Sequence, residues 1–218
     1  MTMRVDIWSD VVCPFCYIGK KRLEAAAQQL ELELEIHWHS FQLDPEAPNK
    51  QNISNSERLA QKYQRSLAEV EHMQQQIADM ARAEGIEFNW QQANSGNTFD
   101  AHRLIHLAQS KGLGNEAKEA LFYSYMTQGL AIGERETLED AASRVGLNPV
   151  EVDDLLDSNE YADFVEFDQK LAKEQLNITA VPFFVFDQRV ALAGAQPREV
   201  FVQVMQKALE TQDHSDQT

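Results

Sequence analysis

The sequence predicts an α/β domain assembled from both ends of the chain, with a large all-helical insertion between its two halves. Residues 1–45 follow a strand–helix–strand pattern, residues 177–212 follow a hairpin–helix pattern, and residues 46–176 show helical periodicity. The polar tail, residues 213–218, is expected to be disordered. A chain of 218 residues with 43% hydrophobic residues has the size and composition of a packed globular protein.

The N-terminal part predicts a strand, a helix and a second strand. Apolar and polar side chains alternate over residues 4–9, as in a strand with one face buried. Apolar residues then recur at helical spacing over residues 18–30, and Pro14 suits the first turn of this helix. Residues 32–41 alternate again until two prolines end the strand.

The middle of the chain predicts helices, apart from a weak strand signal at residues 86–90. Ser54 and Glu57 form a capping box, and apolar residues then step by three or four as far as Gly85, which predicts one long amphipathic helix. The further helices expected here are 98–110, 115–128, 137–145, a short helix from Pro149, and 161–175 with Phe164, Phe167 or Asp168, Leu171 and Ala172 on its inward face.

The C-terminal part predicts a β-hairpin and a closing helix. Residues 182–186 and 190–193 are rich in β-branched and aromatic side chains, and the three residues between them are typical of a tight connection. Apolar residues at helical spacing predict the closing helix over residues 197–209.

Charge and hydropathy exclude several classes of partner. Nineteen basic and thirty-five acidic residues give a formal net charge of −16, which repels nucleic acid and anionic lipid. Neither nucleic acid nor a membrane is therefore expected as a partner. The chain begins directly in a strand pattern without the apolar core of a signal peptide, so a cytoplasmic protein is expected. Monomer and homodimer both stay open.

Cys13 and Cys16 are the only cysteines, and their spacing points to redox chemistry. They lie where the first strand gives way to a helix. Unpaired backbone N–H groups and the helix dipole stabilise a thiolate at such a position, which lowers the thiol pKa below its free value of roughly 8.5. Cys13 is expected to attack a disulfide as the nucleophile, and Cys16, one turn later, to resolve the mixed disulfide.

Two features allow an alternative interpretation. Cys13 and Cys16 could bind zinc if His37 and His39 completed the site, although an exposed strand face explains these histidines more simply. Pro182 could be an ordinary proline at the start of an edge strand, or a cis-proline that presents the backbone of Val181 to a neighbouring thiol and to an extended substrate.

Four stretches, taken in order along the chain, resemble the FrnE-like branch of the DsbA family of thioredoxin-fold oxidoreductases. The resemblance implies a thioredoxin fold with a helical insertion. It also implies that Cys13 attacks, that Cys16 resolves and that a cis-proline loop at Pro182 packs beside them. The stretches are residues 9–19, 97–104, 181–186 and 194–197.

The resemblance implies a thiol-disulfide oxidoreductase or isomerase without a bound metal or organic cofactor. Phe15, Val181, Asn97 and His102 are its expected substrate-binding residues. Phe15 stands where periplasmic DsbA enzymes commonly have histidine, and it cannot donate a hydrogen bond to a thiolate. We therefore expect a reduction potential toward the thioredoxin end of the range between roughly −270 mV for thioredoxin and −120 mV for DsbA.

The expected partner is a disulfide-containing protein or glutathione. The chain also resembles 2-hydroxychromene-2-carboxylate isomerases and kappa-class glutathione transferases, which implies as an alternative a glutathione-dependent isomerase or transferase acting on a small aromatic or electrophilic substrate. In that case glutathione would be a cosubstrate. A binding module without redox turnover is a third hypothesis.

Overall fold

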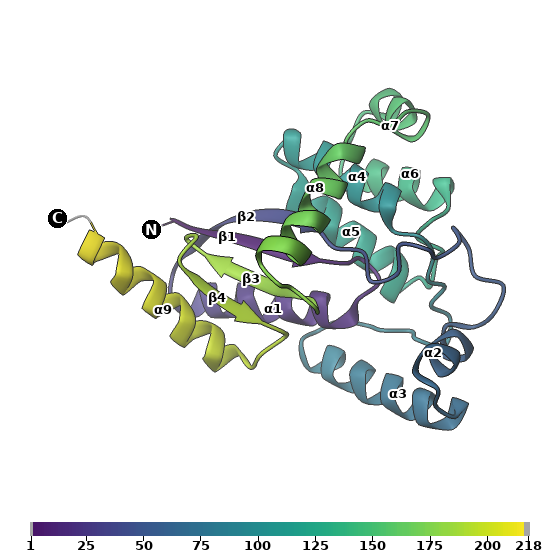
Figure 1. Cartoon of the computed structure of the whole chain (residues 1–218), viewed down its shortest axis with the longest axis horizontal. Helices are drawn as coiled ribbons and strands as arrows, with labels where there is room; N and C mark the ends of the chain where they lie inside the picture. The colour runs from purple at the N-terminus through teal and green to yellow at the C-terminus, as the bar shows by residue number, and fades with distance from the viewer. Residues whose placement is uncertain (1, 216–218) are drawn as a thin grey trace.

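The computed structural model describes residues 2–215 and contains one mixed four-stranded sheet in the order β2-β1-β3-β4 (Figure 1). Strands β1 (Thr2–Ser9) and β2 (Glu33–Ser40) are parallel. A helix connects them, because parallel neighbours need a long crossover connection. The late strands β3 (Phe183–Phe186) and β4 (Val190–Ala193) form a hairpin whose first strand runs antiparallel to β1. The sheet thus joins the two ends of the chain, as predicted.

Helices cover both faces of this sheet. On one face lie α1 (Pro14–Gln29) and the C-terminal helix α9 (Arg198–Ser215), which pack against each other. The ring of Phe201 in α9 meets the ring of Phe184 edge-on at 5.0 Å. On the other face α8 (Ala162–Lys170) packs against β2. The fold is the predicted α/β arrangement with helices inserted between β2 and β3.

The inserted segment is helical, as predicted, and most of it lies beyond the carboxyl end of β1 (Figure 1). Its core is built by α4, α5 and α6, which pack pairwise, with α7 against α4 and α6. The bounds are α2 Asn55–Tyr63, α3 Leu67–Ala83, α4 Phe99–Ser110, α5 Gly114–Met126, α6 Arg135–Arg144 and α7 Pro149–Leu156.

The single long helix predicted from Ser54 to Gly85 is wrong, because the chain forms two helices there. Gln64 adopts a left-handed conformation with φ 53°, which ends α2. A second capping box follows at once: the Ser66 side chain accepts from the backbone of Glu69, and the Glu69 carboxylate accepts from the backbone of Ser66. After the break α3 packs against α1, and Glu84 at the end of α3 pairs with Arg22 of α1 at 2.6 Å.

The inward face predicted for the helix over residues 161–175 is partly wrong. Phe164 and Phe167 are 58% and 62% exposed, whereas Val165, Asp168 and Ala172 are buried. The polar contacts of Asp168 set this rotation, since its carboxylate accepts hydrogen bonds from the Ser40 backbone and a ring nitrogen of His39 in β2. The end of the segment is a π-helical turn, Leu171–Gln175, rather than a continuation of α8.

Two further expectations differ from the structure. The weak strand signal at residues 86–90 gives no strand. Helix α9 continues to Ser215, so residues 213–215 of the tail predicted to be disordered are helical, and residues 216–218 lie outside the described part of the chain. Within residues 2–215, no helix combines the length and apolarity that crossing a bilayer demands.

His39 joins the sheet to α8 and has a large effect on stability. Its ring nitrogens lie 3.0 Å from the Asp6 carboxylate and 2.8 Å from that of Asp168, and its ring stacks on Trp8 at 4.3 Å. Burial lowers the pKa of His39, but the hydrogen bonds to the two carboxylates outweigh burial and raise this pKa to about 9. The folded protein therefore holds His39 charged at neutral pH.

Replacing His39 by glutamine is expected to lower the free energy of unfolding at pH 6 by about 2 kcal/mol, allowing for the partial exposure of the ring. Because the folded pKa is raised, the stabilisation is full below the unfolded value of 6.5 and is lost as pH rises through about 9. Urea unfolding between pH 6 and 10 measures both effects. H37Q, on the exposed end of the same strand, is the matched control, and an equal loss in H37Q would contradict the prediction.

Candidate active site

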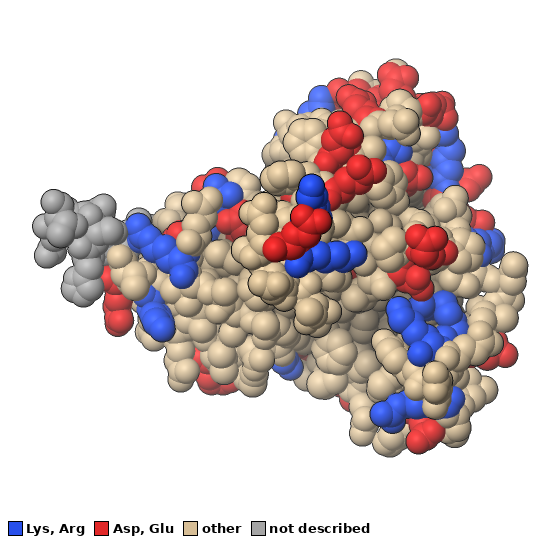
Figure 2. All heavy atoms as spheres, viewed as in Figure 1, with Lys and Arg blue, Asp and Glu red and all other residues tan. Residues whose placement is uncertain are grey.

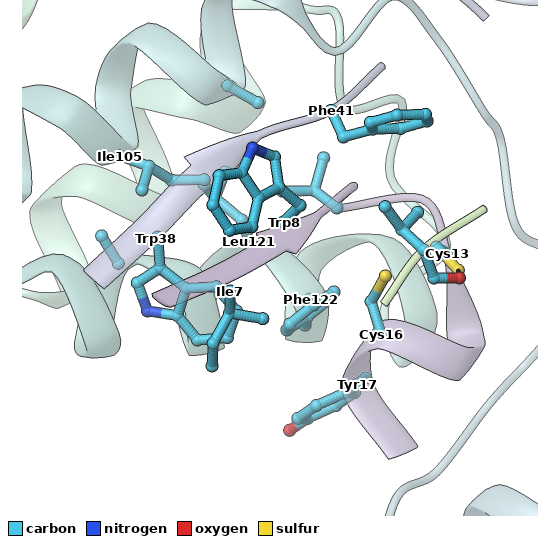
Figure 3. Close-up of a cluster of buried hydrophobic side chains, with 14 of the residues drawn as sticks. Ile7, Trp8, Cys13, Cys16, Tyr17, Trp38, Phe41, Ile105, Leu121 and Phe122 are labelled. Atoms are coloured by element: carbon cyan, nitrogen blue, oxygen red, sulfur yellow. Dashed lines mark hydrogen bonds between the residues drawn. The ribbon is translucent and has the colours of Figure 1, made fainter. Parts of the chain in front are cut away.

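The two cysteines lie at the start of α1, where the end of β1 delivers the chain. Cys13 is the N-cap residue with an extended backbone, and Pro14 occupies the first helical position. A turn at residues 10–13 is closed by a hydrogen bond of 3.2 Å from the Cys13 N–H to the Asp10 carbonyl. Both cysteines are free thiols, 5% and 1% exposed. Figure 3 shows the pair at the edge of a buried cluster that includes Tyr17 and Phe122.

The proline loop packs directly against this pair. The peptide bond between Val181 and Pro182 is cis, which decides between the two interpretations of Pro182. The carbonyl of Val181 accepts a hydrogen bond of 3.7 Å from the Cys13 Sγ. Gly19 allows α1 to approach the loop, because a Cβ at this position would lie 3.1 Å from Pro182 Cγ and 3.0 Å from the ring of Phe184.

Buried charged groups lie beneath the cysteines. The Lys118 side chain, from α5, is completely buried, with its Nζ 3.4 Å from the Ser9 carbonyl and over the rings of Trp38 and Phe122. Burial lowers the pKa of Lys118 to about 8, although the cysteines and Asp10 act in the opposite direction. The ammonium group therefore places a positive charge in an apolar setting next to the thiols.

Asp10 and His102 form a second part of this buried group. His102 Nε2 lies 3.4 Å from Asp10 Oδ1, and both side chains are 1% exposed. The other Asp10 oxygen accepts a hydrogen bond of 2.8 Å from the backbone N–H of Leu43. Burial lowers the pKa of His102. Burial raises the pKa of Asp10, but the close approach of His102 and the hydrogen bond from the Leu43 N–H outweigh it, so the Asp10 pKa is lowered. A carboxylate next to a neutral imidazole results.

The pKa values of the two cysteines shift in opposite directions, and the lowering expected for Cys13 falls on Cys16. The hydrogen bond to Cys16, together with burial, raises the pKa of Cys13. Burial also raises the pKa of Cys16, but the hydrogen bond from Cys13 and the charge of Lys118 outweigh it, and the Cys16 pKa is lowered. These directions favour ionisation of Cys16 over Cys13, and the Lys118 charge contributes to this by acting on the Cys16 sulfur.

A cavity of about 590 Å³ opens beside Cys13. It lies between the start of α1 and the helices α2 and α3, and Cys16 does not line it. Phe15 is 38% exposed and forms part of its apolar wall. Polar and charged side chains from the insertion complete the lining, among them Asp44, Asn55, Arg58, Lys62, Arg65 and Tyr125.

The other two predicted substrate-binding residues lie elsewhere. The Asn97 amide nitrogen donates to the carbonyls of Pro45 and Ala47, and its oxygen accepts from the backbone N–H of Phe99 at the start of α4. Asn97 thus fastens the loop after β2 to α4 and does not line the cavity. His102 is enclosed beneath the cysteines next to Asp10. Of the predicted set, the structure brings Cys13, Cys16, Phe15 and the loop of Val181 together with Pro182.

The histidines considered for zinc are used differently. His39 bonds to Asp6 and Asp168, and His37 bonds to Glu35 on the strand surface at 2.8 Å. Among residues 2–215, no group of three or more histidine, cysteine or acidic side chains is arranged to hold a metal ion.

Sequence analysis did not identify Lys118 or the cationic residues of α2 and of the turn after it as part of the site. Lys118 carried a usable signal, because it shares a helical stripe with Leu121, Phe122 and Tyr125, all of which are buried. A lysine on an apolar stripe is rarely buried without a function or a partner. No such sequence signal marks the cavity residues Arg58, Lys62 and Arg65, because their position beside Cys13 depends on the break between α2 and α3.

Comparison with known proteins identifies the family. The model of the DSBA-like thioredoxin domain matches residues 4–206. The chain belongs to this family. This DSBA-like chain is 34% identical to the probable DsbA oxidoreductase SCO1869 from Streptomyces coelicolor, whose crystal structure superposes with a TM-score of 0.88 over 95% of this chain and 90% of that one. The family and the predicted thioredoxin fold are thus confirmed.

The chain is also similar to one further protein in sequence and to another in fold. The uncharacterized protein YwbO of Bacillus subtilis (strain 168) is 29% identical over 202 residues, which are 92% of this chain and 94% of YwbO. The cytosolic disulfide reductase DsbM from Pseudomonas aeruginosa, in its structure with GSH, is 18% identical with a TM-score of 0.61, covering 97% of this chain and 99% of DsbM. At that identity DsbM shares the fold alone.

Proposed function

We propose that this DSBA-like protein is a thiol-disulfide oxidoreductase that exchanges disulfides through Cys13 and Cys16. The observation that carries the proposal is the meeting of three features at one point: the cysteine pair at the start of α1, the cis Val181–Pro182 loop bonded to Cys13, and a cavity open to Cys13. Membership of the DSBA-like thioredoxin domain family and the similarity to a probable DsbA oxidoreductase support this proposal. We further propose that it works in the cytoplasm, where such a pair is kept reduced between turnovers.

Access decides which sulfur attacks. Cys13 lines the cavity, whereas Cys16 is 1% exposed and does not line it. When a disulfide enters, the Cys13 proton passes to ionised Cys16, and the Cys13 thiolate attacks one sulfur of the substrate. The other substrate sulfur leaves as a thiolate and takes the proton from Cys16, which restores the Cys16 thiolate. Cys16 then attacks Cys13, which releases the substrate and closes the Cys13–Cys16 bond. The reverse sequence delivers a disulfide to a reduced substrate.

The cis-proline loop orients the substrate in this reaction. The Val181 carbonyl faces the Cys13 sulfur, so an extended substrate passing the loop places its own sulfur next to Cys13. Phe15 supplies an apolar contact on the cavity side. Val181 and Phe15 are therefore the proposed substrate contacts, while Asn97 and His102 maintain the surrounding structure.

Thiol-dependent reduction of a model disulfide tests the proposed function. With dithiothreitol as the electron source, the wild-type protein is expected to accelerate reduction of a small chromogenic disulfide, and Cys13→Ser is expected to reduce the rate to that of the uncatalysed reaction. Both proteins are to be checked for the same circular dichroism spectrum. Equal rates for wild type and Cys13→Ser would refute the proposed function.

A glutathione-dependent isomerase or transferase is the second candidate. The cavity beside Cys13 has the volume of a small-molecule site and a partly apolar wall that suits an aromatic or electrophilic compound. The fold is shared with DsbM, whose structure contains GSH. In this candidate Cys16 is dispensable, so turnover of an electrophile with glutathione by Cys16→Ser, at the wild-type rate, would favour it over disulfide exchange.

A further inference from the structure

The cavity beside Cys13 carries positive charge in a protein whose net charge is −16. Arg58, Lys62 and Arg65 line the wall contributed by α2 and the turn after it. Figure 2 shows Lys and Arg atoms gathered over the region of α2 and α3, whereas acidic side chains dominate the upper part of the same view. The cavity wall thus carries more positive charge than the upper part of this face.

The acidic residues of the cavity are already engaged. The Asp44 carboxylate pairs with Arg58 at 3.2 Å, and the Glu69 carboxylate accepts from the backbone and hydroxyl of Ser66 in the α3 capping box. Within the described chain, neither Lys62 nor Arg65 forms an ion pair with a carboxylate. The Lys62 ammonium contacts only the Leu43 carbonyl, at 3.5 Å. Arg65 influences Glu69 at longer range through its charge. Two cationic side chains therefore face the cavity without a bonded counterion.

Arg58 is held in place by a buried polar network. Its guanidinium donates to the Asn55 side chain at 3.1 Å, and Asn55, 6% exposed, bonds in turn to Gln74 and to the hydroxyl of Tyr125. The Nε of Arg58 is buried and has no hydrogen-bond partner in the structure. Arg58 is thus fixed by the fold, whereas Lys62 and Arg65 are exposed side chains that also line the cavity.

We propose that the cavity selects small disulfides that carry carboxylate groups. Its volume of about 590 Å³ suits a molecule of that size, and Lys62 and Arg65 would hold the carboxylates while the disulfide lies at Cys13. The cationic wall raises the local concentration of anionic substrates in a protein that otherwise repels them. This inference rests on the proposed disulfide exchange and adds the charge of its substrate.

The reaction balances without a further reagent in a single turnover. The reduced protein supplies two thiols, and the small disulfide accepts two electrons. The S–S bond of the substrate breaks, the Cys13–Cys16 bond forms, and the two thiol protons leave with the two product thiols. One equivalent of reduced protein therefore yields two equivalents of small thiol.

Three disulfides that differ only in their end groups test the proposal. Dithiodipropionate carries a carboxylate on each arm, 2-hydroxyethyl disulfide a hydroxyl, and cystamine an ammonium. The oxidation of reduced protein is followed by acid quench, alkylation and mass spectrometry, and each rate constant is divided by that for dithiothreitol with the same disulfide to correct for reactivity. The corrected rate constant is expected to be at least about tenfold higher for dithiodipropionate than for cystamine, with a preference that falls as salt is added.

The double variant K62Q/R65Q assigns the preference to the cavity. Both side chains are exposed, so the variant is expected to fold, to lose about tenfold in the rate constant for dithiodipropionate and to keep that for 2-hydroxyethyl disulfide within twofold. R82Q/K207Q makes the same change in net charge outside the cavity lining and is expected to change neither rate constant.

Two results would overturn the proposal. One is equal corrected rate constants for all three disulfides with the wild-type protein, and the other is an equal loss for the anionic and neutral disulfides in K62Q/R65Q. Either result leaves disulfide exchange itself intact. If none of the three disulfides forms a Cys13–Cys16 bond, the proposed function fails instead, so the two failures are distinguishable.

Discussion

Replacing Cys16 by serine is expected to stop disulfide exchange at the mixed disulfide and to lower multiple-turnover activity at least about a hundredfold. In the wild-type protein Cys16 lies one turn after Cys13 and releases the substrate by attacking the bond that Cys13 has formed. A serine hydroxyl is too weak a nucleophile to do so. The covalent complex between Cys13 and the substrate should therefore accumulate and be visible as a mass increase in non-reducing conditions.

Cys13→Ser is the matched control for this trap. Cys16 is 1% exposed and does not line the cavity, so a protein with Cys16 alone is expected to form no mixed disulfide under the same conditions. Trapping by Cys13→Ser and not by Cys16→Ser would reverse the assigned roles. Substrates captured from a cell extract by Cys16→Ser would also distinguish protein disulfides from glutathione as partners.

Replacing Lys118 by methionine is expected to raise the pH at which the cysteine pair first ionises. The Lys118 ammonium is buried next to the thiols, where a positive charge lowers the pKa of Cys16. Without this charge, burial of Cys16 is opposed only by its hydrogen bonds, so the thiolate fraction at neutral pH should fall. The exchange rate at pH 7 should then fall about tenfold or more, since only the thiolate reacts.

The pH dependence of alkylation and of thiolate absorbance measures this shift. K20M is a suitable control, because Lys20 is also buried, at 2% exposed, but its charge is paired with Glu24 and Glu119. K20M should lose stability without moving the ionisation of the cysteines. An unchanged pH profile in K118M, in a protein that remains folded, would show that Lys118 does not stabilise the thiolate.

The cysteine site was predictable because its determinants are local. Cys13 and Cys16 are close in sequence, and the alternating strand before them and the proline after Cys13 fix the helix start without help from the rest of the chain. The assembly of the α/β domain from both chain ends followed from the strand patterns there, whereas the order of the strands came from the structure. The charge distribution within the site was not predictable, because Lys118 comes from a helix about a hundred residues later and acts through space.

The errors within the insertion have physical causes of a different kind. Apolar residues keep a helical spacing across Gln64, so periodicity joined α2 to α3, although the second capping box at Ser66 and Glu69 was present in the sequence. On α8, hydrophobicity favoured Phe164 as an inward residue. The structure exposes Phe164 and buries Asp168, which the prediction offered as an alternative to Phe167, because His39 and the Ser40 backbone bind its carboxylate.

Equilibration of the protein with glutathione redox buffers, followed by alkylation and mass spectrometry, tests the redox pair most directly. We predict that Cys13 and Cys16 are protected together, as one two-electron couple, with a potential nearer to roughly −270 mV than to −120 mV because Phe15 cannot donate to a thiolate. Independent glutathionylation of Cys13 with Cys16 still free, and no Cys13–Cys16 bond at any buffer ratio, would contradict the account.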